Sequence, residues 1–244
     1  MRKKIKQFLK PYKIRGEMFI AYFIRKINKV KNPNFKCNAD TVRCVNNIKS
    51  PNYKYEYFGE NTPVCCATNL YKILKDVTNI LEKNNLEYFI SFGTLLGAVR
   101  HGGLIPWDTD IDIIIPYAKK DKYIEILKKE LSYYEVKETE EDGVVGSVIR
   151  VNLSKKNTLH IDLFTYIEKD KKIIFDYYRK FDEKDIYPLK KISFYDLKLF
   201  APNNVDKHLK NLYGKDYMEY AYKQWALNKS KFKITDYSPA KIEI

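Results

Sequence analysis

Three aspartates at alternate positions, directly before a run of isoleucines, constrain this chain more than any other feature. Asp108, Asp110 and Asp112 precede residues 113–115, whose composition is typical of a buried strand. We expect one strand to include all three aspartates, and their side chains would then project to one side of it. Carboxylates clustered at the end of a buried strand repel one another and resist the loss of water. A hard divalent cation removes both penalties, so the pattern indicates a metal site.

A second acidic strand is predicted farther along the chain. Residues 158–167 are rich in strand-forming types and place His160, Asp162 and Phe164 on one face. A third carboxylate from a neighbouring strand is what a two-metal phosphoryl-transfer site needs. Asp162 could also accept the proton of an attacking hydroxyl. His160 either orients this aspartate or packs beside it.

A simpler interpretation of the aspartates is that they end a strand and face water or nearby lysines. A lone Asp-x-Asp is commonly of this kind, because aspartate is frequent at strand ends. The Gly-Thr turn upstream and the later Asp162 favour the metal site instead.

The segment before the aspartates predicts a strand, a turn, a short helix and a loop. Residues 88–92 are apolar, Gly93 and Thr94 mark the turn, and residues 95–99 form the helix, with Thr94 as its N-cap. Residues 100–106 are punctuated by glycine and proline. Backbone N–H groups at the start of a helix favour phosphate, so Gly93 and Thr94 are candidate phosphate contacts.

Two residues of the following loop carry open alternatives. Arg100 is a candidate partner for a substrate phosphate, because guanidinium groups bind phosphate strongly. It could equally be an exposed loop arginine. For His101, substrate contact and a role in loop structure remain equally open.

These motifs resemble the signature of the LicD family, which includes bacterial phosphocholine transferases and, more distantly, the fukutin-related proteins. The similarity covers Gly-Thr-Leu-Leu-Gly-Ala-Val-Arg-His-Gly-Gly at 93–103 and Pro-Trp-Asp-Thr-Asp-Ile-Asp at 106–112. Thr109 stands where the family has aspartate, and in a strand it would point away from the other three carboxylates. Further similar segments lie at 160–164, 187–189, 200–202 and 209–217, so the resemblance covers about residues 70–217.

The resemblance implies a nucleotidyltransferase-like fold, a divalent metal, and transfer of a phospho-alcohol from a CDP-linked donor to a glycan. Under this interpretation Asp110, Asp112 and Asp162 bind Mg²⁺ or Mn²⁺, with Asp108 on the ion or next to its ligands. Gly93, Thr94 and Arg100 would hold the donor phosphates. The acceptor would be a hydroxyl of a cell-surface glycan or its lipid-linked precursor, and CMP would leave. CDP-choline, CDP-ribitol and CDP-glycerol all remain possible donors.

Two other functions remain open. A nucleotidyltransferase would use the same carboxylates on a nucleoside triphosphate and release pyrophosphate. A non-catalytic lipid- or nucleic-acid-binding protein would depend on the basic N-terminal residues, and the retained carboxylates argue against it.

The basic charge of the chain is concentrated near its start. Residues 1–50 carry a net charge of +12, whereas the other 194 residues carry only +2. This argues against a specific nucleic-acid-binding face on the catalytic part. Residues 1–30 mix cations with apolar groups such as Phe19 and Phe23, which indicates either a helix packed on the core or an interfacial helix on anionic lipid.

We therefore expect a cytoplasmic protein, with peripheral association on the inner face of a membrane as the open alternative. The basic start leads to Pro11 and not to an apolar core, which is unlike a cleavable signal peptide. The longest clear apolar run, residues 18–24, is far shorter than the roughly 20 residues that a membrane span needs.

The expected fold class is α/β, or α+β in stricter terms: a mixed sheet flanked by helices. We place a basic N-terminal helical extension and linker at 1–63, the catalytic domain at 64–228 and a peripheral tail at 229–244. The expected helices are 69–84, 119–131 and 204–222, the last one interrupted at Gly214 and beginning at Asn204 as a possible N-cap. The further expected strands are 144–153, 158–167 and 172–177, with a hairpin turn at 168–171 and a strand within 188–200.

Four cysteines, Cys37, Cys44, Cys65 and Cys66, all precede the motif. We expect reduced structural thiols, with a zinc site as the less favoured alternative. The spacing lacks a Cys-x-x-Cys knuckle, and the adjacent pair is not expected to serve one tetrahedral ion.

Overall fold

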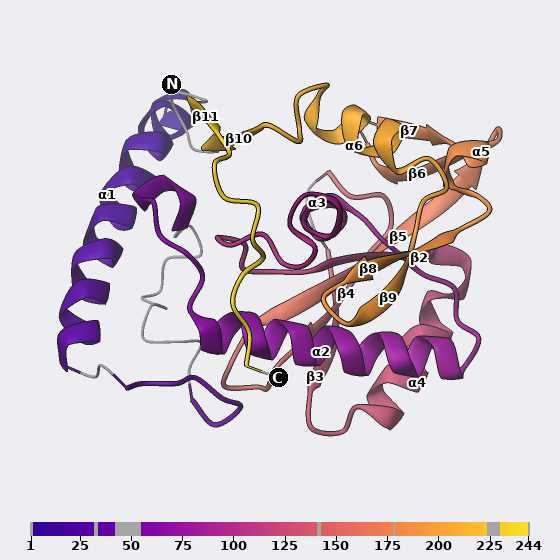
Figure 1. The fold of residues 1–244 in the computed structure, drawn as a ribbon, viewed down its shortest axis with the longest axis horizontal. Coiled ribbons are helices and arrows are strands. Elements are labelled where there is room, and N and C mark those ends of the chain that lie inside the picture. Colours follow the sequence, from indigo (N-terminus) through magenta and orange to yellow (C-terminus); the bar gives the residue numbers. More distant parts are fainter. Residues whose placement is uncertain are drawn as a thin grey trace.

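A mixed sheet forms the centre of the protein in a computed structural model, which describes residues 2–31, 34–41, 55–140, 143–177, 179–223 and 230–243. The strands lie in the order β1-β2-β5-β4-β3, and β6 and β7 continue from the far end of β5 (Figure 1). The bounds are β1 Phe89–Ile90, β2 Asp112–Pro116, β3 Glu135–Thr139, β4 Val148–Asn152, β5 His160–Lys169, β6 Lys172–Asp176 and β7 Arg179–Asp182. Only β2 and β5 pair in parallel among these strands. The expected mixed sheet is confirmed.

Helices cover the sheet and bury its apolar side chains. The longest helix after residue 63 is α2 (Val64–Lys83), whose inner residues Leu70, Ile73, Leu74, Val77 and Leu81 are fully buried. The 3- and 4-residue spacing of these side chains makes one apolar stripe. The predicted helix 69–84 is thus confirmed, although it begins earlier, directly after Pro63.

The remaining elements complete the layers around the sheet. The helices are α3 Phe92–His101, α4 Lys120–Glu130, α5 Glu183–Ile186 and α6 Val205–Tyr213, and the short 3-10 helices are η1 Tyr55–Phe58 and η2 Tyr117–Lys119. Two further hairpins pair β8 (Lys190–Phe194) with β9 (Leu197–Ala201) and β10 (Tyr220–Lys223) with β11 (Ser230–Lys233). Asn204 does cap α6, because its side chain accepts a hydrogen bond from the Lys207 N–H at 3.1 Å. The helix ends at Gly214, so the predicted interruption there is its end.

The N-terminal extension is one long helix, α1 (Arg2–Lys31), at the edge of the molecule (Figure 1). The helix continues through Pro11 without interruption. Its described inner residues contact η1: the Tyr22 ring stacks on that of Phe58 with centroids 4.6 Å apart, and Ala21 is buried next to Tyr55. Within the described ranges, no helix combines the length and the apolar content needed to cross a bilayer.

The last described stretch, residues 230–243, packs more closely on the body than its composition indicates. After β11 it runs past the motif loop toward α2 (Figure 1). The N–H of Ala240 bonds to the Leu104 carbonyl at 2.9 Å, and the N–H of Glu243 bonds to Thr68 Oγ1 at 2.9 Å. Ala240 is buried in the main core, so this stretch covers the loop that follows α3.

The strand expectation for the three aspartates is wrong in one respect. Only Asp112 lies in β2, and Asp108 and Asp110 lie in the chain that leads to it. The reason is the path of the neighbouring strand: β1 pairs with β2 only up to Ile113, and the chain then leaves the sheet to begin α3. Residues before Asp112 therefore have no β1 partner that would keep them in the sheet.

Candidate active site

Four carboxyl groups converge at the end of β2 and β5. The parallel register places Asp112 beside Asp162, and the Asp162 N–H bonds to the Ile111 carbonyl at 2.8 Å. The pKa of Asp112 is raised well above its ordinary value, mainly because packing removes water from this carboxyl group, and then because of the charges of Asp110, Asp108 and Asp162. The structure thus brings all four predicted aspartates into one electrostatic cluster.

The turn before α3 holds Asp112 in place through its backbone. The Gly93 N–H donates to the Asp112 carboxylate, which opposes part of the rise in its pKa. The Asp112 N–H donates to Thr94 Oγ1 at 2.7 Å. Thr94 is therefore not the N-cap that the sequence indicated; Ser91 occupies that position, and the Thr94 hydroxyl joins α3 to β2 instead.

Close approach explains why glycine occupies position 93. A Cβ atom at this position would lie 2.5 Å from Asp108 Oδ2, so a side chain here would require the Asp108 carboxylate to move. The neighbouring Phe92 has a φ of 42°, which is uncommon for a residue with a side chain. Its ring packs between Phe164 and Phe175, with centroid distances of 5.5 and 5.4 Å. The turn is thus held by packing on one side and by carboxylates on the other.

Arg150 on β4 is a site residue that the sequence analysis missed. The antiparallel register places it directly opposite Asp162. Its Nε and Nη2 each donate to one carboxylate oxygen of Asp162 at 2.7 Å, so the pair is bidentate. His160 Nε2 lies 3.5 Å from Asp162 Oδ2, and its Nδ1 faces the Thr158 carbonyl at 2.8 Å, so the ring lies beside this aspartate. An arginine inside an otherwise apolar strand was the available signal for Arg150.

Tyr213, the last residue of α6, is a second missed residue. Its pKa is raised above the ordinary value for tyrosine, first by burial of the hydroxyl and then by the charges of Asp112 and Asp108, while Arg100 opposes the rise. The hydroxyl therefore stays protonated beside the acidic cluster and is available as a hydrogen-bond donor. Tyr213 lies in the segment 209–217 that resembles the family, but the resemblance assigned it no role.

Arg100 and His101 lie at the other end of α3, and their contacts are with the chain that covers it. Arg100 Nε donates to His101 Nε2 at 3.0 Å, and Arg100 Nη1 donates to the Tyr217 carbonyl at 2.8 Å. His101 Nε2 accepts, so the ring proton is on Nδ1, which faces the Ser238 carbonyl at 3.2 Å. Both residues are about 5% exposed. Arg100 is therefore not the exposed loop arginine that was the alternative to a phosphate contact.

Burial also determines the protonation of these two residues. It lowers the pKa of Arg100 to about 10, and it lowers the pKa of His101 to about 4 with the help of the neighbouring Arg100 charge. His101 is therefore neutral near pH 7, in agreement with its role as an acceptor from Arg100.

A buried serine–histidine pair supports the same turn from α6. Ser91 Oγ and His208 Nε2 are 2.8 Å apart, and both residues are almost fully buried. The His208 ring stacks on Phe181 with centroids 4.4 Å apart, and its Nδ1 has no hydrogen-bond partner among the described atoms. Burial lowers the pKa of His208 to about 3, so this ring is neutral in the folded protein.

Three of the four cysteines form a separate cluster at the first turn of α2. The sulfur of Cys37 is 3.5 Å from that of Cys65 and 3.6 Å from that of Cys66, and all three sulfurs lie within 4.8 Å of one another. The sulfurs of the adjacent pair thus lie close to that of Cys37 and to each other, a proximity that the spacing alone did not indicate. These thiols are not in disulfides, and such a donor set suits a thiophilic ion. Cys44 lies outside the described residues.

Comparisons with known proteins relate part of the chain to a described family. Residues 85–204 match the domain family described as LicD/FKTN/FKRP, nucleotidyltransferase domain. The chain is 31% identical over 194 residues to the human ribitol 5-phosphate transferase FKRP, which covers 76% of this chain and 39% of that protein. It is 28% identical over 115 residues to the lipopolysaccharide cholinephosphotransferase LicD of Haemophilus influenzae, covering 41% of this chain and 43% of that protein. The chain thus spans about two fifths of the length of these relatives.

A solved structure shows a weaker likeness. The lincosamide antibiotic adenylyltransferase LnuA aligns with a TM-score of 0.41 and 15% identity, covering 65% of this chain and 89% of that one.

The first prediction concerns Arg150. Replacing it in Arg150→Gln leaves the Asp162 carboxylate without its bidentate partner and beside Asp112. We expect the free energy of unfolding without added metal to fall by about 3 kcal/mol, as is typical when one member of a buried pair is removed. Urea denaturation measures this change. Lys137→Gln, which changes the cross-strand neighbour of Arg150 on β3, is the matched control and should alter stability by less than about 0.5 kcal/mol. Equal effects of both substitutions would show that the Arg150–Asp162 pair is not a stabilising contact.

The second prediction concerns acid stability. The folded-state pKa of His208 (about 3) lies below its ordinary value of 6.5, so below pH 6.5 the unfolded chain binds the proton and the folded protein does not. The contribution of His208 is therefore fully present above pH 6.5 and is lost as the pH falls toward 3. When the pH is lowered from 7 to 5, the free energy of unfolding should decrease in both proteins. We expect the decrease to be about 2 kcal/mol smaller for His208→Phe than for the unchanged protein.

The same series separates this effect from packing. Phenylalanine keeps a ring against Phe181 but leaves Ser91 Oγ without its partner, which changes stability by an amount that does not depend on pH. Denaturation curves at several pH values report both quantities. Parallel pH profiles for the two proteins would contradict the assignment of a neutral His208.

Proposed function

Because residues 85–204 belong to the LicD/FKTN/FKRP family of nucleotidyltransferase domains, we propose that this chain is a phosphotransferase that moves a phospho-alcohol from a CDP-linked donor to a glycan hydroxyl. The two named relatives, a ribitol 5-phosphate transferase and a lipopolysaccharide cholinephosphotransferase, both transfer a phosphorylated alcohol by their names. The acceptor would be a cell-surface glycan or its lipid-linked precursor. CMP would be the leaving group.

The observation that carries this proposal is the convergence of Asp108, Asp110, Asp112 and Asp162. Four carboxyl groups at one place raise the pKa of Asp112 by mutual repulsion and loss of water, and a hard divalent cation relieves both effects. The donor set fits Mg²⁺ or Mn²⁺, which prefer carboxylate oxygens. Asp110, Asp112 and Asp162 would hold the ion, with Asp108 on the ion or next to its ligands. When bound, such an ion neutralises phosphate charge and makes an attacking hydroxyl more acidic.

The chain's own residues prepare this site before any substrate arrives. The Gly93 N–H and the Thr94 hydroxyl fix the carboxylate and the backbone of Asp112. Arg150 donates one hydrogen bond to each carboxylate oxygen of Asp162. Because a carboxylate can accept about four hydrogen bonds, Asp162 can accept further ones. Asp162 can therefore still accept the proton of the acceptor hydroxyl. Preorganised groups of this kind need little rearrangement during reaction.

For the donor phosphates we propose the N-terminal end of α3, where Gly93 and Thr94 lie. Arg100 was the third candidate. Its Nε and Nη1 bond to His101 and to the Tyr217 carbonyl, so any phosphate contact would use the remaining N–H groups of its guanidinium. Tyr213 is the additional donor that the structure places beside the acidic cluster.

A nucleotidyltransferase activity is the second candidate, favoured by the description of the matched domain. The same carboxylates would then act on a nucleoside triphosphate, and pyrophosphate would be released in place of CMP.

The third prediction tests the metal site. Asp112→Asn keeps an oxygen that can accept from the Gly93 N–H but removes one negative charge from the cluster. We expect transfer activity with Mg²⁺ to fall at least about 100-fold. Without metal the variant should be more stable, by on the order of 1 kcal/mol, because a repulsion between carboxylates is removed. The rise in melting temperature on adding Mg²⁺ or Mn²⁺ should be lost.

Asp121→Asn is the matched control, because the Asp121 side chain is 89% exposed on α4. It should leave activity, stability and the metal-dependent rise in melting temperature unchanged. If Asp112→Asn retained normal activity with Mg²⁺, the metal assignment would be wrong.

The fourth prediction separates the two chemistries. The protein is incubated with CDP-choline, CDP-ribitol or CDP-glycerol and a glycan acceptor, and in parallel with nucleoside triphosphates. We expect CMP from at least one CDP-alcohol, together with a phosphodiester on the glycan detected by mass spectrometry. Pyrophosphate from a triphosphate, with no CMP from any CDP-alcohol, would instead establish the nucleotidyltransferase.

A further inference from the structure

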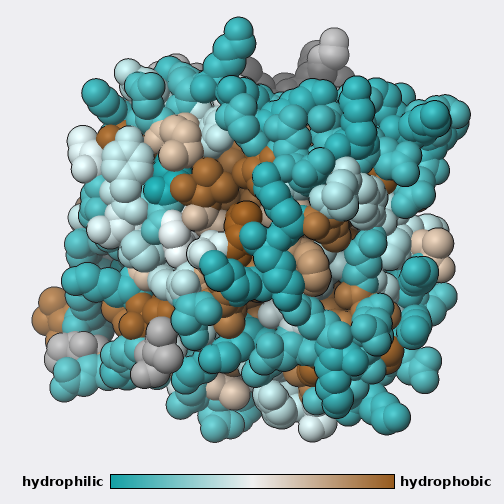
Figure 2. Space-filling model, turned by 45° about the vertical axis from the view of Figure 1, so that its right-hand side comes forward, coloured by the Kyte–Doolittle hydropathy of each residue, from teal (hydrophilic) through white to brown (hydrophobic). Residues whose placement is uncertain are grey.

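The outer face of α1 carries a continuous row of exposed apolar side chains. Their exposed fractions are 60% for Ile20, 62% for Phe23, 53% for Ile27 and 82% for Val30, and Ile24 is 36% exposed. The spacing of three and four residues places all five on one side of the helix. On the face shown in Figure 2, by contrast, hydrophilic residues predominate and apolar residues show as patches among them. An apolar row of this length indicates an interaction surface.

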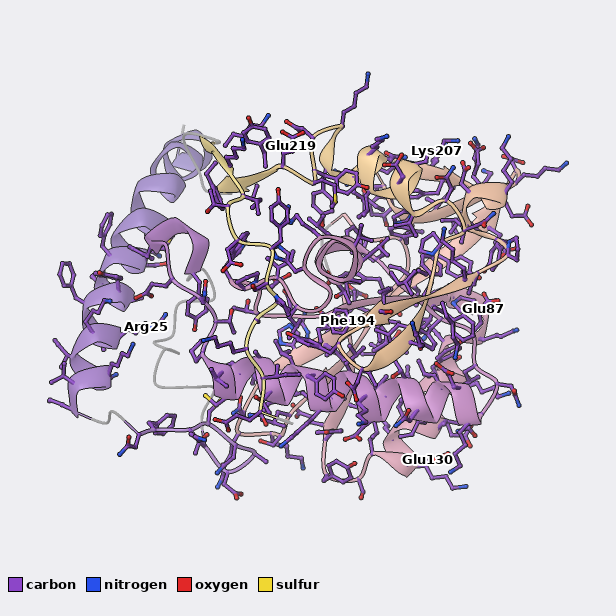
Figure 3. The ribbon with its side chains drawn as sticks, viewed as in Figure 1. Arg25, Glu87, Glu130, Phe194, Lys207 and Glu219 are labelled. Carbon is purple, nitrogen blue, oxygen red and sulfur yellow. The ribbon has the colours of Figure 1, made fainter. Side chains whose placement is uncertain are left out.

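The opposite face of α1 is anchored to the protein, so the apolar row cannot turn inward. Arg25 is only 7% exposed, and its Nη1 lies 2.8 Å from Glu60 Oε2 while its guanidinium covers the Tyr55 ring. Lys26 Nζ lies 3.0 Å from Glu60 Oε1. Figure 3 shows Arg25 on the side of α1 that faces the body. Met18 and Ala21 are buried on the same side.

The charge of the helix shows which partner suits this row. Residues 2–31 contain 11 lysines and arginines and one acidic residue, Glu17, for a net charge of +10. Lys13 and Lys31, seven residues before Ile20 and four after Ile27, lie on the same side as the apolar row and are exposed. Two copies of the chain that met through this face would bring two strongly basic helices together. An anionic surface with an apolar interior satisfies both the charge and the apolar area.

We propose that the outer face of α1 docks the protein on an anionic lipid surface. The apolar row would enter the boundary between headgroups and acyl chains, and the basic side chains would contact the headgroups. The anchored inner face keeps the catalytic part beside the membrane. This proposal concerns binding alone and does not depend on the proposed transfer reaction.

Sedimentation with vesicles tests the proposal. The full-length protein is mixed, at low ionic strength, with vesicles of phosphatidylcholine alone or of phosphatidylcholine with phosphatidylglycerol. We expect binding to the anionic vesicles, at least about tenfold weaker binding to the neutral ones, and release by high salt. Absence of binding to anionic vesicles at low salt, or equal binding to both, would overturn the proposal.

Substitutions on the two parts of the surface give the sharper test. The double variant Phe23→Ser with Ile27→Ser should bind anionic vesicles at least about tenfold more weakly. Lys13→Gln with Lys31→Gln should weaken binding by about fivefold for each charge and reduce its dependence on salt. Tyr177→Ser is the matched control, because Tyr177 is 65% exposed on another part of the molecule; its binding should be unchanged.

Two further measurements test whether the substitutions change the folding or the oligomeric state of the protein. Circular dichroism and melting temperature should be unchanged in these variants, since the replaced side chains face solvent. Analytical ultracentrifugation should find the same oligomeric state for the unchanged protein and for Phe23→Ser with Ile27→Ser. If that variant dissociated a dimer and still bound vesicles normally, the face would be an interface between copies and the lipid proposal would be wrong.

Discussion

The repulsion among four carboxyl groups is the constraint on which the rest of the site depends. The parallel pairing of β2 with β5 brings Asp112 beside Asp162, and the loop before β2 adds Asp108 and Asp110. Such a cluster is unfavourable unless other groups compensate for it. Two elements do so: the turn before α3 through an N–H group, and β4 through the Arg150 guanidinium. Tyr213 on α6 adds no charge, because its hydroxyl stays protonated beside the carboxylates.

The parts of this site that could be predicted from the sequence are those encoded by local pattern. The turn at Gly93, the aspartates and the strand of Asp162 are short, contiguous motifs, and their resemblance to a family added the expected chemistry. The extent of β2 was misjudged because it is limited by β1, whose chain leaves the sheet after Ile90. A strand ends where its partner ends, and a single stretch of sequence does not contain that information.

Arg150 and Tyr213 were missed for a related reason. Each reaches the acidic cluster through a contact between segments far apart in the chain: an antiparallel register with β5 in one case, the placement of α6 in the other. The roles of Thr94, Arg100 and His101 also depended on such contacts, with Asp112 for the first and with the chain around Tyr217 and Ser238 for the others. Residue type alone indicated phosphate for Arg100, whereas the structure shows hydrogen bonds to backbone carbonyls.

The packing of residues 230–243 over the motif loop has a consequence for the order in which the protein matures. Ser238 and Ala240 supply partners to His101 and Leu104, and Phe232 lies against Trp107 with ring centroids 5.6 Å apart. The ribosome makes the motif loop more than a hundred residues before it makes these partners. During synthesis the nascent sheet can pair early, but the loop beside the carboxylates stays hydrated until residues 230–243 emerge. Closure of this loop therefore follows the pairing of the sheet and depends on a segment made more than a hundred residues later.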